Sequence, residues 1–453
     1  MAHTSLSHAI KVRLQSLDRR SRMSQHTGPL VYGLGTLGLT IPGEAFGAFV
    51  YFYYIDVLGL SLGLAAVVRT VYAIWDALND PIFGYLSDNT RTRWGRRRPW
   101  LVLGLPGYLL CFVLVFAVPA AMRGAALVWY ALVTLCLFET LSTVIRTNYA
   151  ALFPERFTTL PDRIHASAFN RVGVLVGLLV GLAVTPLVYR QLAFQGMALL
   201  YAVLGGSLLA LAVARQTEDP AAGTLAVSSP RATLGPILRE RTFWLYALTL
   251  TLISFAFTLF PLAIPFYTKY ALRAPEDTTS VLFGVSLLAA LASVPLWVRL
   301  LRRWGTPRVF LRALGVMVAA CCALGLAPNV PAAVAATVVY GLGWSGCHVC
   351  FDVIRSELMD QHFERSGQRS EGAYYSLLGV GIHLSGVFHA VAMVLIGVMF
   401  GYVSGEQPGL RPDAAFRVLL GVFPAVGLLL ACVLARRFFA AITQRPAPRR
   451  AGP

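Results

Sequence analysis

Two aspartates inside an apolar segment are the residues of this sequence best suited to chemistry. They lie in Trp75-Asp76-Ala77-Leu78-Asn79-Asp80-Pro81, within a run long enough to cross a membrane. A carboxylate near the centre of a bilayer costs about 2.5 to 3.5 kcal/mol even on the most lenient insertion scale. Asp76 and Asp80 are four residues apart, so they share one face of a helix, where like charges repel unless a cation lies between them.

The neighbours of the two aspartates offer further ligands for a cation. Asn79 adds an amide oxygen, and Pro81 frees the carbonyl of Ala77 one turn back. Such a set of oxygen atoms suits sodium or a proton. Two interpretations are open: a cation site that includes Asp76 and Asp80 as sodium ligands, or an ion pair with Arg69, which lies seven residues before Asp76.

The composition of the chain indicates a membrane protein. Of its 453 residues, 57% are hydrophobic and 13% are charged, whereas a soluble domain carries about a quarter charged residues. The net charge of +17 is compatible with nucleic-acid binding, but the arginines lie between apolar runs and no basic stripe alternates with aromatics. We therefore expect a lipid bilayer, and no nucleic acid, as partner. The N-terminal segment is polar and basic and has no apolar core, so we expect that no signal peptide is removed.

Twelve apolar segments are long enough to span a bilayer. The sequence therefore predicts an all-α membrane protein of twelve transmembrane helices in two six-helix halves. A polar stretch with Glu218, Asp219 and Pro220 separates the halves. The expected divisions are an N-terminal tail (1–29), a first bundle (30–214), a linker (215–241), a second bundle (242–438) and a C-terminal tail (439–453).

Orientation follows from the arginines near the helix ends. The tail before the first segment and the loops after the second and eighth are rich in Lys and Arg, whereas the loop after the third has only Arg123. Because basic loops stay in the cytoplasm, both termini and the linker are expected there, in a multi-pass protein of the inner (plasma) membrane.

Two halves joined by a hydrophilic linker resemble the major facilitator superfamily, in which two bundles rock about a midplane site. The loop after the second segment resembles the G-x-x-x-D…G-R-R signature of that superfamily, with a reduced copy at Arg302–Arg308. The matching loop residues, expected to act in gating, are Gly84, Asp88, Gly95, Arg96 and Arg97.

A narrower resemblance is carried by the helix-two motif and by Thr90-Arg91-Thr92-Arg93-Trp94-Gly95-Arg96-Arg97-Arg98-Pro99. Both are similar to the glycoside-pentoside-hexuronide:cation symporters. The resemblance implies that Asp76, Asn79 and Asp80 bind the coupling cation, Na⁺ or H⁺, together with a helix-four threonine, here Thr143. It also implies a monomer with a small-molecule substrate, a sugar or glycoside, and no cofactor.

The residues that would hold the sugar depart from the family pattern. Leu39-Thr40 replaces a Lys-Asp pair of the first helix, and the nearest carboxylate is Glu44, one turn further on. A second sugar-binding aspartate aligns with Arg146, which shares a helix face with Thr143 and Glu139. Two outcomes are open for Arg146: an internal pair with Glu139, or recognition of an anionic group of the substrate.

Two further residues complete the expected substrate site. Arg171 matches a family arginine, and His383 aligns with a family lysine. For His383 two roles are open, a titrating substrate ligand or a hydrogen-bonded histidine between helices. The expected substrate residues are Thr40, Glu44, Glu139, Arg146, Arg171 and His383.

Two other motifs are assigned no chemistry. Gly33-Leu34-Gly35-Thr36-Leu37-Gly38 fits the dinucleotide fingerprint, but no strand precedes it, so we expect helix packing through small residues. Cys347-His348-Val349-Cys350 lacks a second pair of metal ligands. No phosphate-binding loop is present, so transport is expected to use an ion gradient rather than ATP.

The leading prediction is a cation-coupled symporter, not an enzyme, that carries a sugar, glycoside or uronide by alternating access. One alternative is a lysophospholipid symporter, because Cys136–Thr140 resembles a helix-four segment of sodium-dependent lysophosphatidylcholine symporters. Another class is a receptor without transport, or a membrane enzyme with Glu139 or His383 as acid or base.

Overall fold

The computed structural model describes residues 28–90, 92, 95, 97–157, 160–215, 237–366, 371–403 and 408–443. Almost all of these residues are helical. The first helix covers residues 28–52 and continues as the π-helical turn η1 (Tyr53–Val57). The others are α2 (Leu62–Asn89), α3 (Arg98–Phe116), α4 (Ala125–Arg156), α5 (Leu160–Leu178), η2 (Leu179–Val184), α6 (Thr185–Ala214), α8 (Arg241–Phe266), η4 (Tyr267–Ala271), α9 (Asp277–Trp304), α10 (Thr306–Leu326), α11 (Val330–Ser366), α12 (Glu371–Phe400) and α13 (Pro412–Thr443).

Most of these helices can cross a membrane. Among the described residues, nine segments are long and apolar enough, and one of them, His165–Ala214, covers most of α5 and all of α6. With the first helix and α2, the described part of the chain therefore has twelve long helices. The backbone leaves helical geometry at Ala193 (φ 55°, ψ 175°), which divides the fifth membrane-spanning segment from the sixth.

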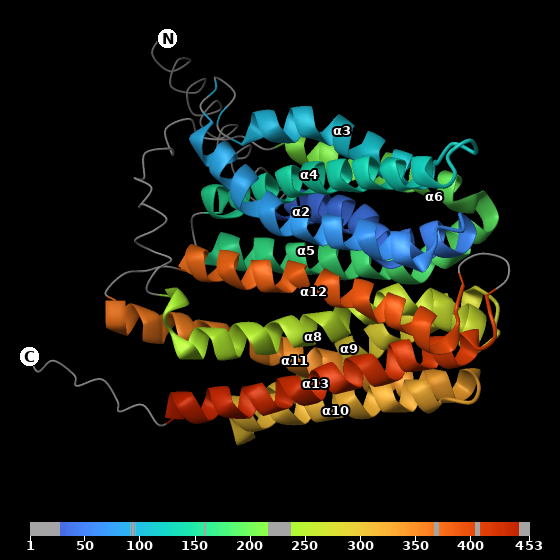
Figure 1. The fold of residues 1–453 in the computed structure, drawn as a ribbon. Helices are drawn as coiled ribbons and strands as arrows, with labels where there is room; N and C mark the ends of the chain where they lie inside the picture. The colour runs from blue at the N-terminus through green and yellow to red at the C-terminus, as the bar shows by residue number, and fades with distance from the viewer. Residues whose placement is uncertain are drawn as a thin grey trace, which may run out of the picture.

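The helices form two groups that lie side by side (Figure 1). In one group α3 packs on α4 and α6, and α2 packs on α4; in the other, α10 packs on α11 and α13, and α8 on α13. The groups meet where α2 contacts α12 and where η2 and α6 contact α9. These groups correspond to the predicted halves, but the predicted linker lies largely outside the described residues.

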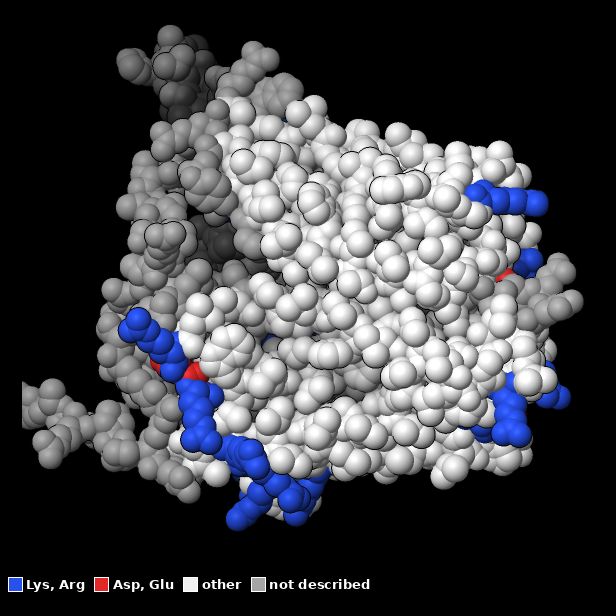
Figure 2. Space-filling view, in the orientation of Figure 1, with Lys and Arg blue, Asp and Glu red and all other residues white. Residues whose placement is uncertain are grey.

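The surface has the distribution of charge that a bilayer requires. Figure 2 shows charged atoms at the two ends of the molecule and a wide uncharged belt between them. Exposed Leu and Val side chains are numerous on the helices, for example Leu103 at 73% and Val203 at 68%. In water such a belt would aggregate, so this surface indicates a multi-pass membrane protein.

Glycines allow the helices to approach closely. A Cβ at Gly33 would lie 2.6 Å from the carbonyl oxygen of Phe169 in α5, and one at Gly38 would lie 2.5 Å from that of Gly205 in α6. A Cβ at Gly173 would in turn lie 2.3 Å from the carbonyl oxygen of Gly33. The glycine motif of the first helix is therefore a packing motif, as predicted, and not a dinucleotide site.

Gly33→Ala tests this packing. The added methyl group meets backbone, which cannot rotate away, so we expect a loss of about 1–3 kcal/mol and a midpoint of heat denaturation lower by roughly 2–8 °C. The measurement is fluorescence-detected size exclusion of detergent-solubilised protein after heating.

Gly47→Ala is the matched control in the same helix. A Cβ there has no atom within 4 Å, so its midpoint is expected to stay the same or to rise. Equal midpoints for the two variants would contradict the packing role of Gly33.

Candidate functional site

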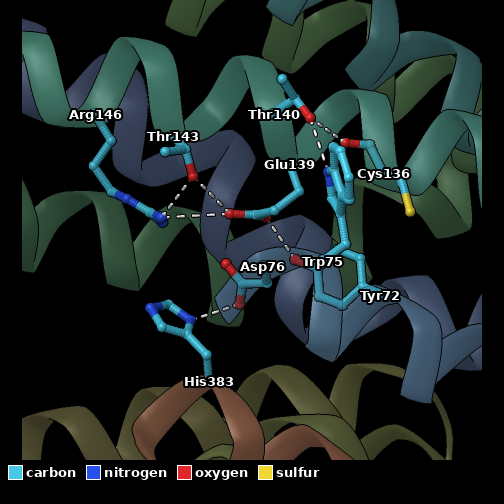
Figure 3. A network of polar contacts seen from close by, with 9 residues as sticks. All are labelled: Tyr72, Trp75, Asp76, Cys136, Glu139, Thr140, Thr143, Arg146 and His383. Atoms are coloured by element: carbon cyan, nitrogen blue, oxygen red, sulfur yellow. Dashed lines mark hydrogen bonds and ion pairs between the residues drawn. The ribbon is translucent and has the colours of Figure 1, made fainter. Parts of the chain in front are cut away.

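Asp76 lies at the contact between α2 and α12. Asp76 is 9% exposed, and its Oδ2 accepts a hydrogen bond from Nδ1 of His383 at 2.5 Å (Figure 3). The other carboxylate oxygen, Oδ1, is buried and has no hydrogen-bond partner among the described residues. The aspartate thus joins helices of the two groups and keeps one oxygen available.

Asn79 follows one turn later on α2 and is 1% exposed. Neither its amide oxygen nor its amide nitrogen has a hydrogen-bond partner within the described part of the chain. A buried amide without partners costs roughly 1–3 kcal/mol, so it is unusual unless a ligand binds there. Asp80 lies in α2 as predicted, but its side chain falls outside the described residues.

Thr143 and Glu139 of α4 face this part of α2 (Figure 3). Thr143 is fully buried, and its hydroxyl donates to Glu139 Oε1 at 3.4 Å. Glu139 is 5% exposed and accepts from the Tyr72 hydroxyl at 2.6 Å, and Asp76 is one of its electrostatic neighbours. Two acidic groups from different helices therefore lie close together, beside a threonine hydroxyl.

Arg146 forms the internal pair that was one of its two expected outcomes. Its Nη2 lies 3.3 Å from Glu139 Oε1 and 3.4 Å from Thr143 Oγ1. The side chain of Arg146 is nevertheless 52% exposed, whereas that of Glu139 is 6% exposed. The guanidinium can therefore hold Glu139 and also present donors to a solute.

Arg69 does not form the ion pair with Asp76 that the alternative interpretation expected, although Asp76 is one of its electrostatic neighbours. Its guanidinium lies over the rings of Tyr51 and Tyr72, at 4.9 and 5.5 Å, and no ion pair joins it to Asp76 among the described side chains. Its Nη2 is 3.4 Å from Nδ1 of His389 in α12. Asp76 is left without an arginine partner there.

The tautomer of His389 follows from its other contacts. Nε2 lies 3.1 Å from the Phe255 carbonyl and 3.0 Å from Thr258 Oγ1, whose proton is donated to Ser254. The proton is therefore assigned to Nε2, and Nδ1 accepts from Arg69. Neither His389 nor Tyr72 was predicted from the sequence; Tyr72 could have been noticed because it precedes Asp76 by one turn.

The other expected substrate residues have different surroundings. The Thr40 hydroxyl donates to the Thr36 carbonyl at 2.8 Å, and its side chain packs on Gly177. Glu44 packs on Gly181, and its carboxylate has no hydrogen-bond or ion-pair partner within the described ranges. Arg171 is exposed on α5 and is an electrostatic neighbour of His348 in α11. Thr40 thus contributes to helix packing, whereas the side chains of Glu44 and Arg171 make no hydrogen bond or ion pair within the described ranges; their role toward a solute stays a prediction.

Part of the predicted loop motif is described. Arg97 is buried and donates to the Ser87 hydroxyl at 3.1 Å, which holds the start of α3 against the end of α2. Gly95 has φ +98°, a conformation that favours glycine. Gly84 and Asp88 lie in α2 without described side chains, and Arg96 lies outside the described residues.

Comparison with known proteins points to membrane transport. A family model described as MFS/sugar transport protein matches residues 31–440. The isoprimeverose transporter of Lactiplantibacillus pentosus is 24% identical over 427 residues, which are 89% of this chain and 86% of that protein. The sodium-dependent lysophosphatidylcholine symporter 1-B of Danio rerio is 35% identical over 175 residues, 38% of this chain. The match spans about a third (33%) of that symporter.

Solved structures with the same arrangement of helices are also transporters. The crystal structure of the nucleoside transporter NupG has a TM-score of 0.66 at 11% identity, over 92% of this chain and 99% of that one. A bacterial homologue of the human drug peptide transporters PepT1 and PepT2 has a TM-score of 0.65 at 12% identity, over 92% and 98%. At these identities the likeness concerns the fold alone.

Tyr72→Phe tests whether the hydroxyl supports Glu139. Loss of a donor to a buried carboxylate is expected to destabilise the protein by about 1.5–3 kcal/mol, measured as a lower midpoint of heat denaturation. Tyr340→Phe is the matched control, because the Tyr340 hydroxyl is buried without a hydrogen-bond partner among the described residues. If both substitutions had the same effect, the contact between Tyr72 and Glu139 would have no special role.

Proposed function

Because the chain belongs to the MFS/sugar transport protein family, we propose that it is a symporter that couples a cation gradient to the movement of a small polar solute. The prediction of an all-α membrane protein with the major facilitator fold is confirmed by the helices and by the solved structures. The relatives are transporters, which supports a transporter rather than an enzyme.

The observation that carries the proposal is the pair of buried oxygens on α2. Asp76 Oδ1 and Asn79 Oδ1 lie one turn apart and have no hydrogen-bond donor among the described residues. A sodium ion that leaves water can bind oxygens of this kind in place of its water ligands. A carboxylate can bind a proton instead. Asp80 from the same helix and Thr143 from α4 complete the proposed site.

The contact between Asp76 and His383 gives the cation a mechanical effect. Asp76 belongs to the first bundle and His383 to the second, and their side chains are 2.5 Å apart. A cation bound at Oδ1 withdraws charge from the carboxylate whose Oδ2 accepts from the histidine, so it weakens that hydrogen bond. Binding therefore changes the contact between the two bundles, which a symporter needs if only certain loaded states are to reorient.

The proposed solute residues adjoin the cation site. Arg146 contacts Thr143 and Glu139 and is half exposed. A solute bound to Arg146 would therefore be linked to Thr143, a proposed cation ligand, through the hydrogen bond between Arg146 and Thr143. Linkage then requires that the solute raise the affinity for the cation by the same factor as the cation raises that for the solute. Glu44, with its unpartnered carboxylate, and Arg171 are the other proposed contacts.

We propose a sugar, glycoside or uronide as the solute, in keeping with the family and with the isoprimeverose transporter. A lysophospholipid is the second candidate, favoured by the symporter of Danio rerio and by the exposed guanidinium of Arg146, which suits a phosphate. The proposed location is the inner membrane, with both termini cytoplasmic and the chain monomeric.

Asp76→Asn is expected to abolish uptake driven by a sodium or proton gradient in membrane vesicles. The amide keeps the size of the side chain but removes the charge that attracts the cation. Insertion and size-exclusion profile are expected to stay normal, since asparagine can still accept a hydrogen bond from His383.

Asp277→Asn is the matched control, because the Asp277 side chain is 48% exposed at an end of the molecule. Its uptake is expected to equal that of the unmodified protein. Full gradient-driven uptake by Asp76→Asn would refute the cation site.

The choice of cation can be tested without a known solute. A cation that binds the folded state stabilises it, by about 2.7 kcal/mol at 100 times its dissociation constant. We expect the denaturation midpoint to rise with Na⁺ or with falling pH, but not with choline, and we expect the rise to be lost in Asn79→Leu. A denaturation midpoint that changes neither with Na⁺ nor with pH would contradict the proposal.

Counterflow into vesicles separates the solute classes. Vesicles loaded with an unlabelled sugar, glycoside or uronide are expected to accumulate the same labelled compound, and lysophosphatidylcholine is tested in the same way. Exchange of lysophosphatidylcholine alone would replace the first candidate by the second. Exchange of neither class would favour a receptor.

A further inference from the structure

Asp56 is a buried carboxylate far from the proposed cation site. It lies in η1, where the first helix ends, and its side chain is 2% exposed. Two groups from the other bundle bind it: Lys269 Nζ lies 2.5 Å from Oδ2, and the Tyr270 hydroxyl donates to Oδ1. Both partners belong to η4, which ends the corresponding helix of the second bundle.

Aromatic side chains pack directly beneath this ion pair. Phe52 and Phe266 lie 5.2 Å apart in edge-to-face contact, and Phe49 and Phe283 lie 6.1 Å apart. All four are buried, and each pair joins the first bundle to the second. Lys269 Nζ also lies 5.9 Å above the Phe52 ring. The carboxylate is therefore sealed from the interior by an apolar layer that connects the bundles.

A second ion pair at the same end has a different character. Arg190 of α6 and Asp277 of α9 form an ion pair, also between the bundles, but their side chains are 54% and 48% exposed. Exposed pairs contribute little because water and salt screen them. Asp56 differs, since its side chain is 2% exposed, although that of Lys269 is 50% exposed. Separating Asp56 from Lys269 and Tyr270 would therefore leave its buried charge without partners.

We propose that Asp56 is a positioning residue of the transport cycle, the group that locks the two bundles together at this end of the molecule. The inference rests on the proposed function only in that alternating access requires this end to open. The end can open only when Asp56 releases Lys269 and Tyr270 and the phenylalanine pairs separate. The Arg190–Asp277 pair adds little to the lock.

The test measures the opening of this end directly, in the full chain in lipid nanodiscs. Spin labels are attached through non-natural amino acids at positions 123 and 410, which leaves the seven cysteines unchanged. Position 123 lies beside the 57–61 segment of the first bundle. Leu410, 94% exposed, lies two residues before α13, the last helix of the second bundle. It adjoins Gly409, which lies close to Tyr402, and Tyr402 contacts Tyr270. Pulsed electron resonance then gives the distribution of distances.

Asp56→Asn is expected to raise the ratio of long to short label–label distances about tenfold. This corresponds to a shift of about 1.4 kcal/mol in the equilibrium between the closed and the open state of this end. Arg190→Gln, the matched control, is expected to change it less than about twofold. A distribution for Asp56→Asn that matches the unmodified protein, or an equal shift in Arg190→Gln, would overturn the proposal.

Tyr270→Phe and Lys269→Gln keep the test decisive if Asp56→Asn fails to fold. Each removes one partner and leaves the carboxylate in place, so each is expected to raise the share of long distances as well. No shift in either would overturn the proposal. Because no solute or cation is added, the result is independent of whether the cation site of α2 is correct.

Discussion

A charged group inside a bilayer needs a partner, and this constraint organises the structure. Asp56 has Lys269 and Tyr270, Glu139 has Tyr72 and Arg146, and Asp76 has His383. Two of these three sets join the two bundles. The acidic groups therefore decide where the bundles are attached to each other, while the apolar belt decides only that both lie in the membrane.

Glu44 is an acidic residue within the membrane-spanning part that lacks such a partner among the described residues. Its carboxylate has no hydrogen bond or ion pair among the described residues, although its helix packs tightly on η2 through Gly181. An acidic side chain inside a membrane protein that has no partner in the chain costs free energy. Such a side chain is kept when a group outside the chain becomes its partner at some stage. A solute hydroxyl or a proton would do so, and either fits a carrier better than a static receptor.

The sequence predicted the helices well and the contacts between them poorly. Hydropathy marks each membrane segment because lipid permits few alternatives to a helix. Spacing within one helix also predicts reliably, so the shared face of Glu139, Thr143 and Arg146 was confirmed by their contacts. Partners on different helices depend on rotation and depth, which spacing does not contain. Thus Arg69 was a candidate partner for Asp76 and instead contacts His389. For His383 the sequence left open a hydrogen bond between helices, and spacing could not name its partner, which is Asp76.

The contact between α2 and α12 explains how one small ion could affect a whole bundle. Arg69 and Asp76 are seven residues apart on α2, and their partners His389 and His383 are six apart on α12. At 1.5 Å per residue the two contacts lie about 10 Å apart along both helices, so they fix relative rotation as well as distance. Arg69 donates to a neutral nitrogen of His389, whereas Asp76 offers a carboxylate to which a cation can also bind. An ion at Asp76 would therefore loosen one of two attachments and leave the other as a pivot, which favours rocking of the bundles over their separation.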